Sequence, residues 1–157
     1  MDEPQRAEAM AREYLDTMER LGDVWLLNGT SWWLAIALDR QGRADEAAVV
    51  AESLDPSYRR MEVIGGINRA IALSSARATR GGHDEAIALA TEAATIARST
   101  DSMISRSLAL EHLGRLQGRT DPSRAAATLE EVTVVNVEWG NVVGAARTRR
   151  TLDALRA

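Results

Sequence analysis

The sequence contains no cysteine, no phenylalanine and no lysine, and only 4% of its 157 residues are aromatic. Without cysteine the chain can form neither a disulfide nor a thiolate metal site, which is typical of proteins in a reducing compartment. It also lacks an apolar run of about 18 residues that could cross a membrane. The amino-terminal residues are polar and acidic, unlike a signal peptide. We therefore expect a cytoplasmic protein.

The charge balance argues against two classes of partner. The formal net charge is −4, the isoelectric point is near 5.3, and all nineteen basic residues are arginine. Broad binding to nucleic acid or to an anionic membrane needs a concentrated basic footprint. The one basic run, Arg147 with Arg149 and Arg150, is interpreted as a solvated helix face. We expect no direct nucleic-acid contact and no membrane association.

The most informative pattern is a repeat of 39 residues. Ala47, Ala86 and Ala125 stand at this interval, and each follows a short polar or glycine-containing turn. Repetition at this length indicates stacked helical hairpins, because each hairpin has an apolar face that only its neighbours can cover. The turns with their alanines read Gln41-Gly42 to Ala47, Gly81-Gly82 to Ala86, and Gly118-Arg119-Thr120 to Ala125. The repeat predicts an all-α solenoid.

Residues able to cap a following helix recur between the alanines. Asp23, Asp101 and Asn141 are placed as caps, and Asp55-Pro56 has the same function in the middle of the chain. With the apolar spacing at helical period, these boundaries predict about eight helices. They are expected at about 4–21, 24–41, 44–54, 57–80, 84–98, 102–117, 122–138 and 142–156.

Three segments do not fit a smooth helical pattern. Asn28-Gly29 could end a short turn, with a later helix start at Thr30 or Ser31. Gly65-Gly66 could bend a long helix, since two glycines cost roughly 2 kcal/mol against alanine. The segment Val132 to Val137 is β-branched, but the repeat places it in a helix, and we follow the repeat.

The repeated turn Gly-x-x-Asp-Glu-Ala, with Gly42 and Ala47 and again with Gly81 and Ala86, resembles that of tetratricopeptide repeat (TPR) proteins. Leu113-Gly114 is similar to the large-small pair of a leading TPR helix. The resemblance implies a superhelix of antiparallel hairpins over one domain, residues 1–157. Its repeats would be about 24–54, 57–98 and 102–138, flanked by helices 4–21 and 142–156. The long period departs from the common 34 residues and resembles sensor arms of bacterial transcriptional activators and signal-transduction ATPases.

Both ends of the predicted solenoid are open to interpretation. The chain begins with a returning helix and ends with a leading one, so each end would expose a face that another repeat could cover. The chain would then be part of a longer solenoid or would self-associate through its terminal helices. Alternatively, helix 142–156, rich in arginine and threonine, is itself a polar cap.

No catalytic, metal or cofactor site is predicted. His83 is expected in an exposed turn, and His112 is interpreted as a surface residue with no nucleophile beside it. The acidic pairs at 45–46 and 84–85 begin returning helices, where negative charge stabilises the helix dipole by about 0.3–1 kcal/mol. Phosphate-loop, zinc and serine-hydrolase motifs find no match.

Trp25, Trp32 and Trp33 crowd one helix in a chain poor in aromatic residues. Three rings do not fit one seam lined with alanine, so we predict that Trp32 projects into a concave groove as a binding anchor and that Trp33 packs in the core. The alternative is that all three rings pack in the core or between repeats. Repeat register adds four further candidate partner-binding residues to the groove: Asn68, Arg69, Arg106 and Glu111.

These features favour a non-catalytic module that holds a partner protein or peptide in its concave groove. The alternative is a regulatory domain whose superhelix changes pitch when a small molecule or peptide enters, as the resemblance to activators implies. The repeat itself does not identify the partner.

Overall fold

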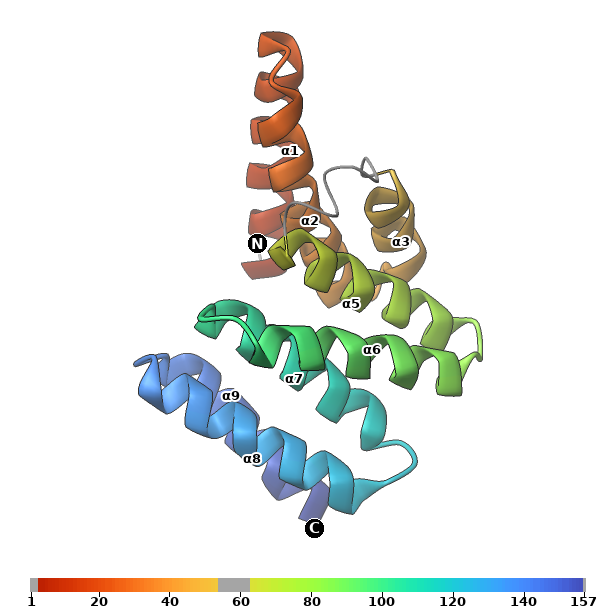
Figure 1. The fold of residues 1–157 in the computed structure, drawn as a ribbon, viewed down its shortest axis with the longest axis vertical. Helices are drawn as coiled ribbons and strands as arrows, with labels where there is room; N and C mark the ends of the chain where they lie inside the picture. Colours follow the sequence, from red (N-terminus) through yellow and green to blue (C-terminus); the bar gives the residue numbers. More distant parts are fainter. Residues whose placement is uncertain (1–2, 54–62, 157) are drawn as a thin grey trace.

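The computed structural model describes residues 3–53 and 63–156, and this part of the chain is helical throughout, with short turns and no strand (Figure 1). The all-α prediction is therefore confirmed. The helices are α1 (Glu3–Leu21), α2 (Val24–Arg40), α3 (Ala44–Glu52), α5 (Val63–Thr79), α6 (His83–Arg98), α7 (Met103–Gln117), α8 (Pro122–Glu138) and α9 (Val142–Arg156).

Helix starts lie close to the predicted positions and use side-chain caps. Asp23 accepts from the backbone N–H of Leu26 to begin α2, and Asn141 accepts from Gly144 at the start of α9. The predicted cap at Asp101 is wrong by one residue, because Ser102 caps α7 instead. The predicted cap at Asp55-Pro56 and the start of the helix that follows it lie outside the described residues.

The repeated turn has a backbone reason for its glycine. Gly42 and Gly81, 39 residues apart, have φ angles of 77° and 86°, a left-handed conformation that side chains disfavour. Each ends a leading helix and lets the chain reverse into α3 or α6, whose first turns hold the acidic pairs. His83 begins α6 and is half-buried, more enclosed than predicted.

The three irregular segments are all helical. α2 continues through residues 28 and 29, and α5 contains both Gly65 and Gly66. Within α8, Val132 and Val135 are buried whereas Val134 and Val137 are exposed. This spacing of three residues on the buried face is helical, so tertiary packing overrides the β propensity of valine.

Consecutive helices pack as hairpins stacked along the long axis (Figure 1). α5 also contacts α2 and α7, so the leading helices α2, α5 and α7 form a continuous inner layer. Ala47, Ala86 and Ala125 are fully buried where the returning helices approach that layer. Gly114 allows a similar approach, because a Cβ there would lie 2.8 Å from the Leu129 side chain.

Buried apolar residues form two clusters along the stack. One joins α1, α2 and α3 with Ala72 of α5, and the other extends from α5 to α9. None of the described helices is both long and apolar enough to cross a membrane. The fold therefore leaves the inner surface, where helices distant in sequence face one another, as the place to search for a site.

Candidate functional site

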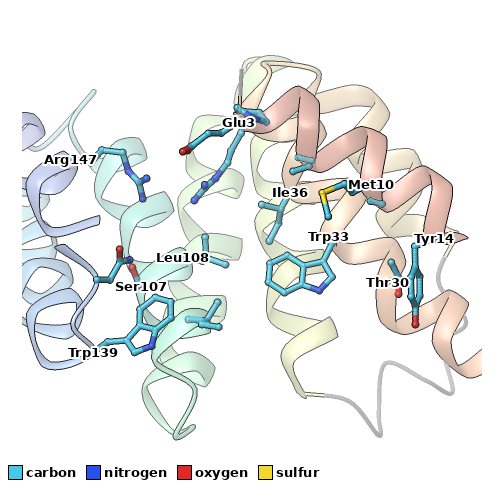
Figure 2. Close-up of a pocket in the computed structure, with 17 residues that line it drawn as sticks. Glu3, Met10, Tyr14, Thr30, Trp33, Ile36, Ser107, Leu108, Trp139 and Arg147 are labelled. Carbon is cyan, nitrogen blue, oxygen red and sulfur yellow. The ribbon is translucent and has the colours of Figure 1, made fainter. Parts of the chain in front are cut away.

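Two adjoining cavities of about 620 Å³ and about 370 Å³ lie on the inner surface. The larger is enclosed by α1 and α2 on one side and by α7, the end of α8 and α9 on the other (Figure 2). Both volumes fall in the range of roughly 300–1,000 Å³ that small-molecule sites occupy. The two cavities share six lining residues: Glu3, Pro4, Ile36, Arg40, Leu108 and Arg147. We call them together the inner groove.

The larger cavity has apolar walls that face each other. Trp33, Met10 and Ile36 lie on one wall, and Trp139 and Leu108 lie on the other (Figure 2). Trp33 is 44% exposed and Trp139 is 45% exposed, although both are large apolar side chains. Exposed aromatic surface that converges on a cavity indicates a binding site more than a packing defect.

The predicted placements of the two adjacent tryptophans, Trp32 in the groove and Trp33 in the core, are both wrong. Trp32 is only 9% exposed, and Trp33 lines the cavity while its ring lies 3.7 Å from that of Trp32, centroid to centroid. Repeat register agrees with the burial of Trp32, which stands 39 residues before Ile71 and 78 before Leu110, both of them buried. Register alone does not place Trp33, because it stands 39 residues before Ala72, which is fully buried, and 78 before Glu111, which lines the groove. The side chain of Trp25 lies outside the description.

Helical spacing places the lining residues of α2 together. Thr30, Trp33, Ala37 and Arg40 are separated by three or four residues and share one helix face. Other residues missed by sequence reasoning come from elements far away, among them Tyr14 and Met10 of α1 and Trp139 at the end of α8. No local pattern signals their convergence.

The smaller cavity is lined by paired charges. Arg147 donates to both carboxylate oxygens of Glu111, at 2.8 and 2.7 Å, and this hydrogen bonding raises the pKa of Arg147. Arg115 lies 3.6 Å from the carboxylate of Asp39. These pairs tie α7 to α9 and α7 to α2 across the inner surface.

Arg40 lines both cavities and has no ion pair among the residues that the structure describes. Desolvation inside the concave surface lowers the pKa of its guanidinium, and the charges of Arg147 and Arg115 lower it further. The nearby carboxylates of Glu111 and Asp39 oppose this shift. Three guanidinium groups and three carboxylates, those of Glu3, Asp39 and Glu111, thus line the two cavities.

Of the predicted partner-binding residues, only Glu111 lines the inner groove. Asn68 is fully buried and donates to the carbonyl of Ile64, one turn earlier in α5. Arg69 is half-buried on α5, outside both linings. Arg106 is half-buried on α7 and lies on the side toward Glu131 of α8. The pKa of that carboxyl is lowered first by its hydrogen bond with Arg98 and then by nearby charges, including that of Arg106.

The prediction that His112 is a surface residue without a nucleophile beside it is wrong. His112 is buried, with Nε2 2.9 Å from Ser74 Oγ and Nδ1 3.1 Å from Arg115 Nη2. Ser74 donates its own proton to the carbonyl of Ala86 at 2.7 Å. Because Arg115 can only donate, His112 is neutral and carries its proton on Nε2. Burial lowers the pKa of His112 to about 4.

This arrangement is structural and not a catalytic pair. Ser74 is fully buried, and its hydroxyl proton already bonds to the backbone, so its oxygen is neither accessible nor activated. Among the described residues, no group of three or more histidine or acidic side chains is arranged to hold a metal ion.

Comparison with known proteins supports this architecture. No protein-family model and no curated protein matches the sequence. Among solved structures, the chain is similar to the nearly identical TPR-like repeats of a Podosopora anserina protein assigned as a kinesin light chain, with 17% identity, a TM-score of 0.50, and coverage of 100% of this chain and 98% of that one. A point variant of the same protein gives 17% identity and a TM-score of 0.52, with 100% and 97% covered. Likeness at this identity concerns the fold alone, and the fold is TPR-like.

Proposed function

We propose that this chain is a non-catalytic interaction module that binds a segment of a partner protein in the inner groove. The observation that carries the proposal is the pair of half-exposed indoles, Trp33 and Trp139, on opposite walls of the larger cavity (Figure 2). Tryptophan is the residue type most enriched among side chains that dominate binding energy at interfaces. The TPR-like fold agrees with this role, because stacked hairpins create extended concave binding surfaces.

The charged end of the groove would orient such a segment. Glu111 and Arg147 neutralise each other, so they present fixed hydrogen-bonding groups at little net charge. Polar groups at the edge of an apolar anchor site contribute more to specificity than to affinity. The partner segment would therefore insert a bulky apolar side chain between the indoles and place polar groups toward α7 and α9.

The test compares proteins retained from a lysate by the wild-type chain and by single variants, with quantitative mass spectrometry. Trp33→Ala and Trp139→Ala should each lose the same set of partners, with binding weakened by on the order of 2 kcal/mol. Val134→Ala is the control, because Val134 is exposed on α8 and does not line the groove. If Val134→Ala loses the same partners, or if both tryptophan variants keep them, the groove is not the site.

A ligand-sensing regulatory role is a second candidate, favoured by one specific observation. Glu3 of α1 and Arg147 of α9 line the same cavity, and the charge of Glu3 is among the causes that raise the pKa of Arg147, after the hydrogen bonds that Arg147 donates to Glu111. An occupant would therefore touch the first and the last described helix at once. Such contacts would let binding change the pitch of the superhelix, because a ligand shifts a conformational equilibrium by its differential affinity.

The absence of cysteine makes this candidate directly testable. Arg6→Cys on α1 and Arg150→Cys on α9 are exposed positions for a pair of fluorescent labels. A sensing domain would show a change in the efficiency of fluorescence resonance energy transfer between the labels when a ligand fills the groove. A passive binding module would show tight binding with unchanged transfer.

We infer that residues 1–157 form one repeat domain and that the protein is cytoplasmic. We also infer that its repeat has the long period of the sensor arms of bacterial activators. The support for a single domain is that each described helix packs on the next, from α1 to α9. Self-association through the terminal helices remains a prediction. Sedimentation across a range of concentrations, with Val143→Asp as a variant on the exposed surface of α9, tests it.

A further inference from the structure

We infer that the larger cavity of the inner groove is a small-molecule site for an amphipathic anion, a ligand with an apolar body and one negatively charged head group that Arg40 holds. The inference rests on the ligand-sensing candidate and deepens it, because it names the class of ligand. It does not require that a partner protein bind the groove.

The shape of the groove matches such a molecule. The larger cavity of about 620 Å³ has mostly apolar walls, whereas the smaller one is lined mainly by charged and polar side chains. Arg40 belongs to both linings and therefore stands where the two meet. A ligand whose body lies between Trp33 and Trp139 would place its head group near this junction (Figure 2).

The charges select the sign of the head group. Arg147 is engaged with Glu111, and Arg115 lies near Asp39, so Arg40 is the guanidinium in the described groove without an ion-pair partner. The two further arginines near it are balanced by the carboxylates of Glu111 and Asp39, so the charge of Arg40 is the one left for a head group to pair with. An anion would pair with Arg40 and offset the desolvation of its charge more fully than a neutral hydrogen-bond acceptor would.

Removal of the Glu3 charge can be compared with removal of the Arg40 charge as a test of this site. Glu3 lines both cavities from the first turn of α1 and is exposed, so its carboxylate competes with an incoming anion for the arginines. Removal of this charge should strengthen anion binding. This effect is opposite in sign to the effect expected from removing the charge of Arg40.

The experiment uses isothermal titration calorimetry of the full chain with four ligands that share a ten-carbon body: decanoate, decyl sulfate, decanol and decyltrimethylammonium. We expect the two anions to bind roughly tenfold more tightly than decanol, the effect of one charge-assisted pair, and the cation to bind most weakly. Decanoate and decyl sulfate distinguish a carboxylate from a sulfate-type head group.

The variants separate the head-group contact from the apolar contact. Arg40→Gln should abolish the preference for anions, Arg40→Lys should keep part of it, and Glu3→Gln should increase it. Arg150→Gln is the matched control, since Arg150 is an exposed arginine of α9 that does not line the groove. Trp33→Ala should weaken all four ligands alike. Circular dichroism of each variant verifies that the helices are retained.

Two results would overturn the inference. If Arg40→Gln keeps the wild-type preference for anions, the head group is not held by Arg40. If no ligand binds, the cavity is not a small-molecule site, although the partner-binding proposal would still stand on its own lysate experiment. Binding of the anions without a change in transfer between the labels on α1 and α9 would instead remove the sensing role and leave the site.

Discussion

The amino-terminal helices α1 to α3 and the carboxy-terminal helices α5 to α9 are stabilised by different means. In the amino-terminal cluster, two of the seven buried residues are branched aliphatics and the others are alanine. In the carboxy-terminal cluster, nine of fifteen are leucine, isoleucine or valine. Larger side chains bury more apolar area and leave larger cavities when truncated. The carboxy-terminal part is thus the more deeply packed of the two.

Polar contacts divide in the same way. The carboxy-terminal part has buried hydrogen bonds between helices, such as Ser107 to Asn136 at 3.0 Å. In the amino-terminal part, Glu8 instead accepts from Gln41 at 2.8 Å and from Arg43 at 2.7 Å, nearer to solvent. Buried bonds are costly to break because water does not replace them, whereas exposed ion pairs contribute little. Substitutions and acid should therefore affect the two parts differently.

The largest expected effect comes from truncation in the carboxy-terminal cluster. Leu129→Ala removes a side chain that is 1% exposed and packs over Gly114, and should cost about 2–5 kcal/mol of unfolding free energy. The loss of unfolding free energy for Leu34→Ala should fall at the low end of that range, because the buried side chains around Leu34 are mostly alanine. Urea denaturation of both variants gives the comparison. A greater loss for Leu34→Ala would contradict the packing contrast.

Acid should destabilise the carboxy-terminal part first, through His112. Its pKa is about 4 in the folded chain against 6.5 in the unfolded one, so the unfolded state binds the proton more strongly. The stabilisation is complete above pH 6.5 and is lost as the pH falls toward 4, by about 3 kcal/mol in total. Urea midpoints between pH 7 and pH 4 measure this loss.

Glu8 provides the contrasting pH range in the amino-terminal part. Hydrogen bonds, first from Gln41, lower its pKa from 4.5 to about 2. Its contribution is therefore present above pH 4.5 and is lost as the pH falls toward 2. His112→Gln should flatten the stability profile between pH 6.5 and 4.5 but leave the loss at lower pH. A profile unchanged by this variant would show that His112 is not the group that titrates.

Overpacking at the repeated alanine compares the two parts at equivalent positions. Ala86 and Ala47 occupy the same register, and both are fully buried. Ala86→Leu should cost about 1–3 kcal/mol, because the carbonyl of Ala86 also accepts from Ser74 and the helices cannot separate easily. Ala47→Leu should lower the free energy of unfolding by less than Ala86→Leu does, because Ala47 lies in the smaller cluster. Unchanged denaturation midpoints for Ala86→Leu would disprove the repeat register.

The smallest effect is expected from the ion pairs. Glu8→Gln should cost less than about 1 kcal/mol, and added salt should reduce the difference further. Glu131→Gln, which removes the partner of Arg98, is the equivalent change in the carboxy-terminal part. Thermal unfolding at low and high salt measures both. A loss of several kcal/mol for Glu8→Gln would show that this contact holds α1 in place.

The site was only partly predictable from the sequence. The position of Glu111 in the lining of the inner groove was expected from repeat register, and the same register applied to Trp32 would have placed it with the buried Ile71 and Leu110. The prediction rested instead on the argument that three tryptophan rings do not fit one seam lined with alanine, and it placed Trp32 in the groove and Trp33 in the core. Arg40 was not predicted as a site residue. Whether a charged side chain lacks an ion-pair partner depends on how the charged residues around it pair with one another, and most of those residues belong to other helices.

The 39-residue period, the glycines of the turns and the alternation of apolar residues by themselves determined the helices and their order. They could do so because these signals act within one hairpin or between adjacent hairpins, over distances that the chain keeps short. Only the tertiary structure decided that Glu3 and Arg147 would line one cavity and that His112 would be buried beside Ser74. Those contacts join residues that are far apart in sequence, and they depend on the rotation of each helix and the curvature of the whole stack, to which every interface contributes.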